Sequence, residues 1–199
     1  EQLLSFTSGY SGNPGDVACT QDQQVSLQDC VRTVYRENFQ YEPGTTFHYG
    51  PAHMHTAAAM AEQATGRDWH ELVAEYLTVP LNMDDTDFAF RARGNPPVSG
   101  GLRSSADDYA NFLESYFNGS FIPQWQVELS RDRTENVAFA FSPISQIAGT
   151  TWRYALGHWR ECGGRFPACD GPAIVSSTGA FGFTPWIDRQ NGYWGVLAV

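Results

Sequence analysis

Residues 42–50 read Glu42-Pro43-Gly44-Thr45-Thr46-Phe47-His48-Tyr49-Gly50, and an alanine-rich stretch follows them directly. Residues 52–65 of that stretch are rich in Ala and Met, which favour a helix and suit close packing in a protein interior. Gly66 is the expected end of this helix, because glycine readily adopts the left-handed conformation found at helix C-termini. We expect this helix to be the most buried one in the chain.

Three more helices are predicted from an N-cap residue followed by an apolar stripe. Each start pairs a capping side chain with an acidic residue three positions later. The pairs are Ser26 with Asp29, Asp68 with Glu71, and Ser105 with Asp108. Apolar residues then recur at helical spacing, and we interpret these stripes as core rather than as a carbohydrate-binding platform.

The last third of the chain is rich in aromatic and β-branched residues, which are typical of strands. The expected strands are residues 151–159, 173–177, 181–188 and 193–199. Asn191-Gly192 between the last two predicts a hairpin. Helices followed by such a meander indicate an α+β fold, in which helices flank an antiparallel sheet, as a single domain over residues 1–199. The abrupt start and the apolar last strand suggest an incomplete domain, truncated at both ends.

The composition fits one globular domain and argues against several classes of function. The 199 residues are 42% apolar and 14% aromatic, enough for a full core. The net charge of −10 repels phosphate backbones and anionic membrane surfaces, so nucleic acid is not expected as a partner. No apolar run reaches the roughly 18 residues of a membrane span. All 12 basic residues are arginine, so the chain contains no lysine.

Four cysteines form two locally spaced pairs, Cys19 with Cys30 and Cys162 with Cys169. Because their spacing is not that of metal ligands, we predict two short-loop disulfides. Disulfides imply an oxidising compartment, so the protein is expected to be secreted or periplasmic. The alternative is four free thiols buried in a cytosolic protein.

Several familiar enzyme motifs are absent from the sequence. It has no Gly-x-Ser-x-Gly elbow, Walker loop, dinucleotide-binding glycine pattern or His-Glu-x-x-His motif. The glycine-rich residues 8–15 predict turns rather than a phosphate site. His48, His53 and His55 lie close together, and zinc would need a fourth ligand such as Asp84. Hydrogen bonding within the fold explains such histidines more often, so we predict no metal and no cofactor.

Four further segments accompany residues 42–66 in a fixed order. They read Leu3-Leu4-Ser5-Phe6-Thr7-Ser8-Gly9, Val79-Pro80-Leu81-Asn82-Met83-Asp84-Asp85-Thr86, Ser99-Gly100-Gly101-Leu102-Arg103-Ser104-Ser105-Ala106-Asp107-Asp108 and Ser177-Thr178-Gly179-Ala180-Phe181-Gly182. In order and spacing, the set resembles the serine β-lactamase and penicillin-binding-protein superfamily, in particular its class-C-like esterases and D-Ala-D-Ala peptidases. The resemblance runs over nearly the whole chain.

The resemblance implies a β-lactamase/transpeptidase-like fold and assigns roles by position. Tyr49 falls on the tyrosine of the family's Tyr-x-Asn motif, which exchanges protons with the nucleophile and the leaving group. Pro51 stands where the family has Asn, so an amide that contacts the substrate or the catalytic lysine is lost. Ser177-Thr178-Gly179 falls on the Lys-Thr-Gly or His-x-Gly motif of the sheet edge strand, whose backbone helps to bind substrate. Ser177 replaces the usual cation.

Each of these assignments has a purely structural alternative. Tyr49 would then staple its loop onto the alanine-rich helix, and residues 177–179 would form an ordinary strand with a glycine bulge. The family context favours the catalytic interpretation of Tyr49. For residues 177–179 it leaves the two interpretations balanced.

The resemblance also implies that the nucleophile is missing from this chain. The family's reaction begins with a Ser-x-x-Lys pair on a helix upstream of the segment that matches residues 3–9. The chain starts at that segment and has no lysine. Without a neighbouring cation, ionising a phenol of pKa about 10 at pH 7 costs about 4 kcal/mol, and burial adds to this cost. Arginine supplies charge but accepts no proton. We therefore expect the chain to be inactive alone.

Two functions from different classes fit the sequence. The first is a portion of a secreted serine hydrolase that cleaves a small-molecule ester or amide, or a peptide, through an acyl-enzyme. A missing N-terminal segment or another chain would then complete the fold. The second is a non-catalytic β-lactamase-like subunit for binding or assembly, for example in a filament, which the absence of lysine favours.

Overall fold

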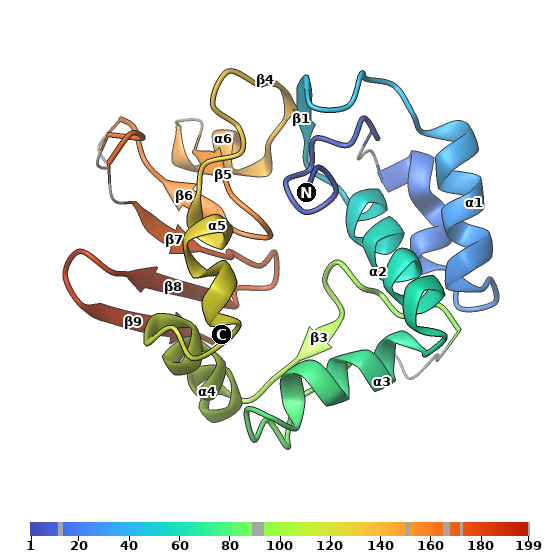
Figure 1. Cartoon of the computed structure of the whole chain (residues 1–199). Coiled ribbons are helices and arrows are strands. Elements are labelled where there is room, and N and C mark those ends of the chain that lie inside the picture. The colour runs from blue at the N-terminus through green and yellow to red at the C-terminus, as the bar shows by residue number, and fades with distance from the viewer. Residues whose placement is uncertain (12–13, 89–93, 150–151, 165–167, 172, 199) are drawn as a thin grey trace.

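The molecule has one side made of helices and another side built on a sheet in the computed structural model, which describes residues 1–11, 14–88, 94–149, 152–164, 168–171 and 173–198. One side contains the helices α1 (Leu27–Glu37), α2 (Pro51–Thr65) and α3 (Trp69–Val73) (Figure 1). The other side contains a five-stranded sheet, with α4 (Ala106–Phe117) and α5 (Gln126–Ser130) packed on one of its faces. The predicted α+β class is confirmed.

The predicted helix starts are confirmed. The Ser26 hydroxyl caps α1 and accepts a hydrogen bond from the backbone N–H of Asp29 at 3.1 Å. Asp68 and Glu71 form a complete capping box at the start of α3, and Ser105 caps α4. Each cap satisfies a backbone donor that the first turn of a helix leaves without a partner.

Helix α2 has the burial and the ending that the sequence predicts. Six of its residues are buried, compared with three in α1 and four in α4. Gly66 follows its last turn with φ of +69°, the left-handed conformation of a glycine C-cap. Pro51 occupies the first turn, where its missing N–H costs no hydrogen bond.

The large sheet is an antiparallel meander in which each strand pairs with its neighbour in sequence. Its strands are β5 (Arg153–Tyr154), β6 (Trp159–Glu161), β7 (Ile174–Ser176), β8 (Thr184–Asp188) and β9 (Tyr193–Leu197). The hairpin predicted at Asn191-Gly192 is confirmed. The N–H of Gly192 donates to the carbonyl oxygen of Asp188 at 3.0 Å, and Gly192 has φ of +77°.

The prediction of one strand over residues 151–159 is wrong. The chain reverses within this segment, where the N–H of Ala155 donates to the carbonyl oxygen of His158 at 3.0 Å and Gly157 has φ of +83°. The segment therefore forms the tight hairpin of β5 and β6. Aromatic residues on both arms resemble one continuous strand in the sequence. Residues 177 and 181–183 also lie outside the strands, in the turn between β7 and β8, while residues 150, 151 and 199 lie outside the described residues.

Two short strand pairs and several short helices complete the described fold. Strand β1 (Thr46–His48) pairs in parallel with β4 (Ala138–Phe141), and β2 (Asp87–Phe88) pairs antiparallel with β3 (Leu102–Arg103). The short helices are η1 (Pro14–Gln21), η2 (Ala74–Thr78), η3 (Pro123–Trp125) and α6 (Pro143–Ala148). Helix η2 continues α3 directly and covers Tyr76 and Leu77 of the apolar stripe predicted after Asp68. The other short segments carry too few residues for a periodic pattern, so the sequence did not predict them.

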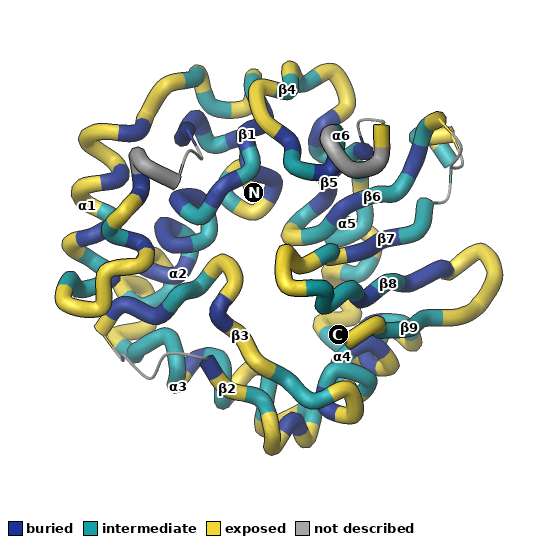
Figure 2. The backbone as a smooth tube through the Cα atoms, turned by 180° about the vertical axis from the view of Figure 1, so that it is seen from behind, coloured by how far each residue is buried: buried dark blue, intermediate teal, exposed yellow. Residues whose placement is uncertain are grey.

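A mainly aromatic cluster joins the N-terminal segment and β1 to the edge of the large sheet. Its buried members are Phe6, Phe47, Ile144, Trp152, Tyr154 and Trp159. A second cluster packs Leu113 and Tyr116 of α4 against Val175 of β7 and Ile187 of β8. The apolar stripe of α4 is thereby confirmed as core. Figure 2 shows buried stretches at β1 and along β7 and β8.

Both predicted cysteine pairs are disulfide-bonded. Cys19–Cys30 joins η1 to α1, and Cys162–Cys169 closes a short loop after β6. In the part of the chain that the structure describes, no helix combines the length and the apolar character needed to cross a membrane.

Candidate active site

Tyr49 lies in the connection between β1 and α2. Its backbone N–H donates to the carbonyl oxygen of Phe141 on β4 at 3.1 Å, which continues the β1–β4 pairing by one residue. Gly50 and Pro51 follow at once and begin α2. The backbone that carries the phenol is therefore held by the β1–β4 pairing before it and by the start of α2 after it.

The Tyr49 side chain is half-buried in the aromatic cluster. Its ring stacks on the indole of Trp159 with centroids 5.4 Å apart and planes inclined by 23°, and it also contacts Phe6 at 4.7 Å. Burial raises the pKa of the phenol above its ordinary value of 10. At pH 7 the phenol is therefore neutral, as the sequence predicts. Its ring contacts attach the loop to the sheet.

Residues 177–179 continue the β7–β8 ladder beyond the end of β7. The N–H of Ser177 donates to the carbonyl oxygen of Pro185 at 3.1 Å, and the N–H of Gly179 donates to that of Phe183 at 2.8 Å. The ladder keeps its register through these two bonds, so the predicted glycine bulge is wrong. A Cβ atom at position 179 would lie 2.9 Å from the oxygen of Phe183, and this close approach explains the glycine.

The resemblance implies that this segment belongs to an edge strand, but β7 lies between β6 and β8 in the sheet. Because Ser176 pairs with Trp159, the first residue of β6, residues 177–179 extend beyond β6 and have no residue of that strand beside them. Because Ser177 and Gly179 direct their N–H groups to β8, the alternation of an antiparallel ladder directs the N–H of Thr178 to the opposite edge. Pro185 lacks an N–H and cannot return a hydrogen bond to the carbonyl oxygen of Ser177. An extended substrate could pair with the backbone of Thr178 in the manner of an added strand.

Trp159 connects the two predicted site segments. It lies directly opposite Ser176 in the β6–β7 pair, and Ser176 lies opposite Trp186 in the β7–β8 pair. The side chains of residues paired in this way project from one face of a sheet. The indole that stacks on Tyr49 therefore lies in the cross-strand row of Trp159, Ser176 and Trp186, and Ser176 directly precedes Ser177. The sequence predicted Tyr49 and Ser177 but not Trp159, because a tryptophan in an aromatic strand reads as ordinary core.

A carboxyl group also lies near this row. Glu161 follows Trp159 on β6 by two residues, so it projects from the same face. Burial raises the pKa of its carboxyl group above the ordinary value. The sequence analysis missed Glu161, since an isolated acidic residue in a strand carries no recognisable motif.

Ser8 and His53 of α2 form a hydrogen-bonded serine–histidine pair. The Nε2 atom of His53 lies 2.9 Å from the carbonyl oxygen of His48, which can only accept a hydrogen bond. Nε2 therefore carries the proton, and Nδ1 accepts from the hydroxyl of Ser8 at 2.8 Å. The His53 ring is fully buried, and burial lowers its pKa to about 4. This pair ties residues 3–9 to α2, and the low basicity of His53 disfavours it as a proton acceptor.

The histidines predicted as a possible zinc site have other partners. His53 is bonded as described, and the Nδ1 atom of His55 lies 3.2 Å from the carbonyl oxygen of Pro51. Within residues 1–11, 14–88, 94–149, 152–164, 168–171 and 173–198, no three His, Cys, Asp or Glu residues are grouped as metal ligands.

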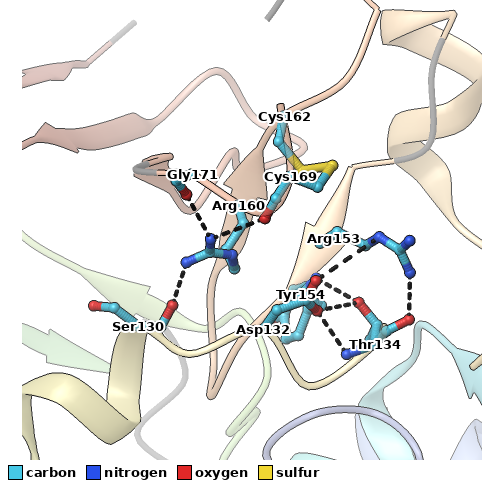
Figure 3. Close-up of polar contacts among 9 residues, drawn as sticks. All are labelled: Ser130, Asp132, Thr134, Arg153, Tyr154, Arg160, Cys162, Cys169 and Gly171. Atoms are coloured by element: carbon cyan, nitrogen blue, oxygen red, sulfur yellow. Dashed lines mark hydrogen bonds and ion pairs between the residues drawn. A yellow bond between two sulfur atoms is a disulfide. The ribbon is translucent and has the colours of Figure 1, made fainter. Parts of the chain in front are cut away.

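Arg160 braces the sheet from the side opposite Tyr49. Figure 3 shows its guanidinium reaching the carbonyl oxygens of Ser130, Cys169 and Gly171, the last two at 3.4 and 3.2 Å. The Cys162–Cys169 disulfide closes a loop that ends at one of these acceptors, and Gly171 follows that loop by two residues. This clamp joins α5, β6 and the disulfide loop, and so it supports the strand that carries Trp159.

Comparison with known proteins gives a family and a fold. The family model described as Beta-lactamase matches residues 1–199. Among solved structures, the chain is similar to a Bacteroides dorei protein described as a beta-lactamase, with 29% identity and a TM-score of 0.79 over 98% of this chain and 61% of that one. No curated protein matches the chain.

Two more distant structures share the fold. A beta-lactamase/D-alanine carboxypeptidase from Yersinia pestis is 17% identical, with a TM-score of 0.68 over 98% of this chain and 61% of that one. An octameric penicillin-binding protein homologue from Pyrococcus abyssi is 18% identical, with a TM-score of 0.70 over 98% of this chain and 50% of that one. The chain thus spans less than two thirds of the length of each of these proteins.

Proposed function

The chain belongs to the Beta-lactamase family, and from that premise we propose that it is the C-terminal portion of a secreted or periplasmic serine hydrolase. The enzyme would cleave a small-molecule ester or amide, or a peptide, through an acyl-enzyme. Its nucleophile would belong to a Ser-x-x-Lys helix in a part of the protein outside this sequence.

The observation that carries the proposal is the position of the Tyr49 phenol. The ring stacks on Trp159, and Trp159 lies opposite Ser176, one residue before the proposed substrate-binding segment 177–179. A proton carrier thus lies on the same sheet face that leads to an open backbone edge at Thr178. Acyl transfer requires such a pair, one group that moves protons and one that holds the substrate in register.

The raised pKa of Tyr49 defines what the missing segment would contribute. A lysine ammonium near the phenol would lower its pKa and allow the phenolate to accept the proton of the attacking serine hydroxyl. The serine oxygen would bond to the acyl carbon, and the phenol would return the proton to the departing alcohol or amine. This chain contains only arginine as a cation, so the proposal requires the lysine from elsewhere.

The position of Ser177 bears on the substrate. The family's usual cation at this position is replaced by a neutral hydroxyl, which removes a charged partner for a substrate carboxylate. We therefore favour neutral esters and amides over penicillin-type substrates. The two disulfides support the proposed oxidising compartment, because cytosolic thiols are normally kept reduced.

Labelling of the complete gene product tests the proposal. We expect a fluorophosphonate to add a phosphonyl mass to the serine of an upstream Ser-x-x-Lys, and p-nitrophenyl acetate to be hydrolysed. Intact-mass spectrometry measures the first result and release of p-nitrophenol the second. A complete protein that is neither labelled nor active would contradict the hydrolase proposal.

A non-catalytic assembly subunit remains the second candidate, and the raised pKa of an uncompensated Tyr49 favours it. The Pyrococcus abyssi homologue is described as octameric, so assembly has a precedent within this fold. Light scattering on the complete protein separates the two candidates. A defined oligomer without serine labelling supports assembly, and a labelled monomer excludes it.

A further inference from the structure

A cavity of about 220 Å³ lies between the sheet and the two helices on its face. Helix α4 supplies one wall with Phe112 and Tyr116, and Leu129 of α5 supplies another. Strands β7 and β8 form the floor through Val175 and Ile187. The cavity is partly open to solvent, so a ligand can enter it from the surface.

The lining of the cavity is apolar and carries no formal charge at neutral pH. Its described lining residues are aromatic or aliphatic for the most part and include no Asp, Glu or Arg. The one ionisable base is His158, and burial lowers its pKa to about 4, so the imidazole is neutral at pH 7. A charged ligand would lose its hydration here without gaining a counter-ion, whereas an apolar chain would lose nothing.

The cavity is continuous with the proposed substrate segment. Ser177 belongs to both, because it lines the cavity and begins the edge that the ladder leaves open at Thr178. Ser177 follows Val175 by two residues, so its side chain projects from the face that α4 covers, whereas Thr178 projects from the face of Trp159. The polar edge of the segment and the apolar cavity thus meet at one residue.

We propose that this cavity, between α4, α5 and strands β7 and β8, binds the aliphatic chain of the substrate's acyl group. The inference rests on the proposed hydrolase function and adds to it a substrate class, medium-chain neutral acyl esters or amides. The cavity is several times larger than the space that one water molecule needs, so it has room for an aliphatic chain of several carbons.

A series of p-nitrophenyl esters on the complete protein tests the acyl-chain assignment. Each methylene buried is worth about 0.8 kcal/mol, so kcat/KM should rise by up to about four-fold per carbon from acetate to hexanoate. The gain should stop once the chain is longer than the cavity. Equal kcat/KM values for acetate, butyrate and hexanoate esters would overturn the assignment.

A matched pair of variants on α5 locates the effect. Leu129 lines the cavity, whereas Val127 of the same helix is 76% exposed and lies outside it. Leu129→Trp should lower the hexanoate-to-acetate ratio of kcat/KM by at least ten-fold, and Val127→Trp should leave that ratio unchanged. If Leu129→Trp does not fold, Leu129→Ala enlarges the cavity and should move the optimum to longer chains. An unchanged optimum in Leu129→Ala would contradict the proposal.

A binding measurement tests the cavity assignment separately from the hydrolase function. 1-Hexanol is neutral and is not hydrolysed, and saturation-transfer NMR should detect its binding to the complete protein and to the Val127→Trp variant but not to Leu129→Trp. Binding without any serine labelling would refute the hydrolase function and leave the cavity assignment intact. Hydrolysis without hexanol binding would refute the cavity assignment alone. Binding to residues 1–199 but not to the complete protein would mean that the additional segment fills the cavity, which also refutes it.

Discussion

The indole of Trp159 supports the phenol ring of Tyr49 across the boundary between the sheet and the β1–α2 connection, at a centroid distance of 5.4 Å. Trp159 is 2% exposed and also contacts Tyr154 and Phe47 edge-on. The orientation of the proposed proton carrier therefore depends on a strand that lies more than one hundred residues later in the chain. This dependence gives the first prediction.

Trp159→Leu should reduce the esterase kcat of the complete protein, because a leucine cannot fix the angle of the Tyr49 ring. Trp159→Phe keeps a flat surface and should retain most of the activity. Loss of the large buried ring should also lower the free energy of unfolding by about 2–4 kcal/mol in Trp159→Leu. Trp125→Leu is the control, since Trp125 is 54% exposed. Equal kcat values for the Leu and Phe variants would contradict the positioning role.

Tyr49→Phe removes the proposed proton carrier and keeps the aromatic packing. We expect kcat of the complete protein to fall by a factor of about 10² to 10⁴, the usual effect of losing a general acid–base group. The thermal midpoint should change little. Tyr76→Phe, on an exposed ring of η2, serves as the control. A variant that keeps full activity would leave Tyr49 with only its structural role.

The buried tyrosines should make the chain unstable at high pH. Burial raises the pKa of Tyr109 to about 12 and that of Tyr154 well above its ordinary value. A phenol in the unfolded chain ionises near pH 10, so the unfolded state loses protons first. The stability due to each phenol is complete below pH 10 and declines as the pH rises toward the folded pKa, by up to about 3 kcal/mol for Tyr109. Urea unfolding at pH 8 and pH 11 measures the loss, and Tyr109→Phe should reduce it.

His53 should make the chain sensitive to acid. Its pKa is about 4 in the folded state and near 6.5 when exposed, so the unfolded state binds the proton first as the pH falls. Its contribution is complete above pH 6.5 and is lost between pH 6.5 and 4, amounting to roughly 3 kcal/mol. His53→Gln should flatten the pH dependence of urea unfolding over that interval. Ser8→Ala keeps the imidazole and should keep the slope while lowering stability by about 1–3 kcal/mol at pH 7.

The clamp of Arg160 should be coupled to one disulfide and not to the other. Replacing Cys162 and Cys169 by Ser should cost about 2–3 kcal/mol, and Arg160→Met should cost about 1–3 kcal/mol. Both changes release the same loop, so their combined effect should differ from the sum by more than about 0.5 kcal/mol.

The Cys19–Cys30 disulfide provides the matched control for this cycle. Its serine double variant should combine additively with Arg160→Met, because it lies in the helical half of the molecule. Non-reducing peptide mapping should first show both native pairs. Additivity in both cycles would contradict a shared role for Arg160 and the Cys162–Cys169 loop.

The elements predicted correctly from the sequence are those whose signals are local. The caps at Ser26, Asp68 and Ser105 fix helix starts through neighbours three residues away, and Asn191-Gly192 fixes a hairpin through backbone conformation. The turn at Gly157 was not predicted, because one glycine between aromatic residues is a weak signal for a turn. The parallel pairing of β1 with β4 joins segments about ninety residues apart, and no local pattern encodes it.

The residues of the candidate site also differ in whether a local pattern in the sequence identifies them. Tyr49 and Ser177 could be predicted because they fall on family motifs, whereas Trp159, Glu161 and the cavity under α4 depend on how distant segments pack. The apolar stripe of α4 was predicted as core, which is correct for Leu113 and Tyr116. Periodicity shows which face of a helix is buried, but it does not show whether the opposing surface fills the space.

Pro185 gives the tip of the β7–β8 hairpin a looser attachment than the strands that lead to it. Opposite Ser177 the ladder has one hydrogen bond where a regular antiparallel pair has two, because the ring of Pro185 replaces a donor. Local opening of a hairpin starts where the fewest bonds must break. The amide protons of Ser177 and Gly179 should therefore exchange with deuterium sooner than those at the centre of β8. We also expect the rate of this local opening to affect how quickly a ligand reaches the backbone of Thr178.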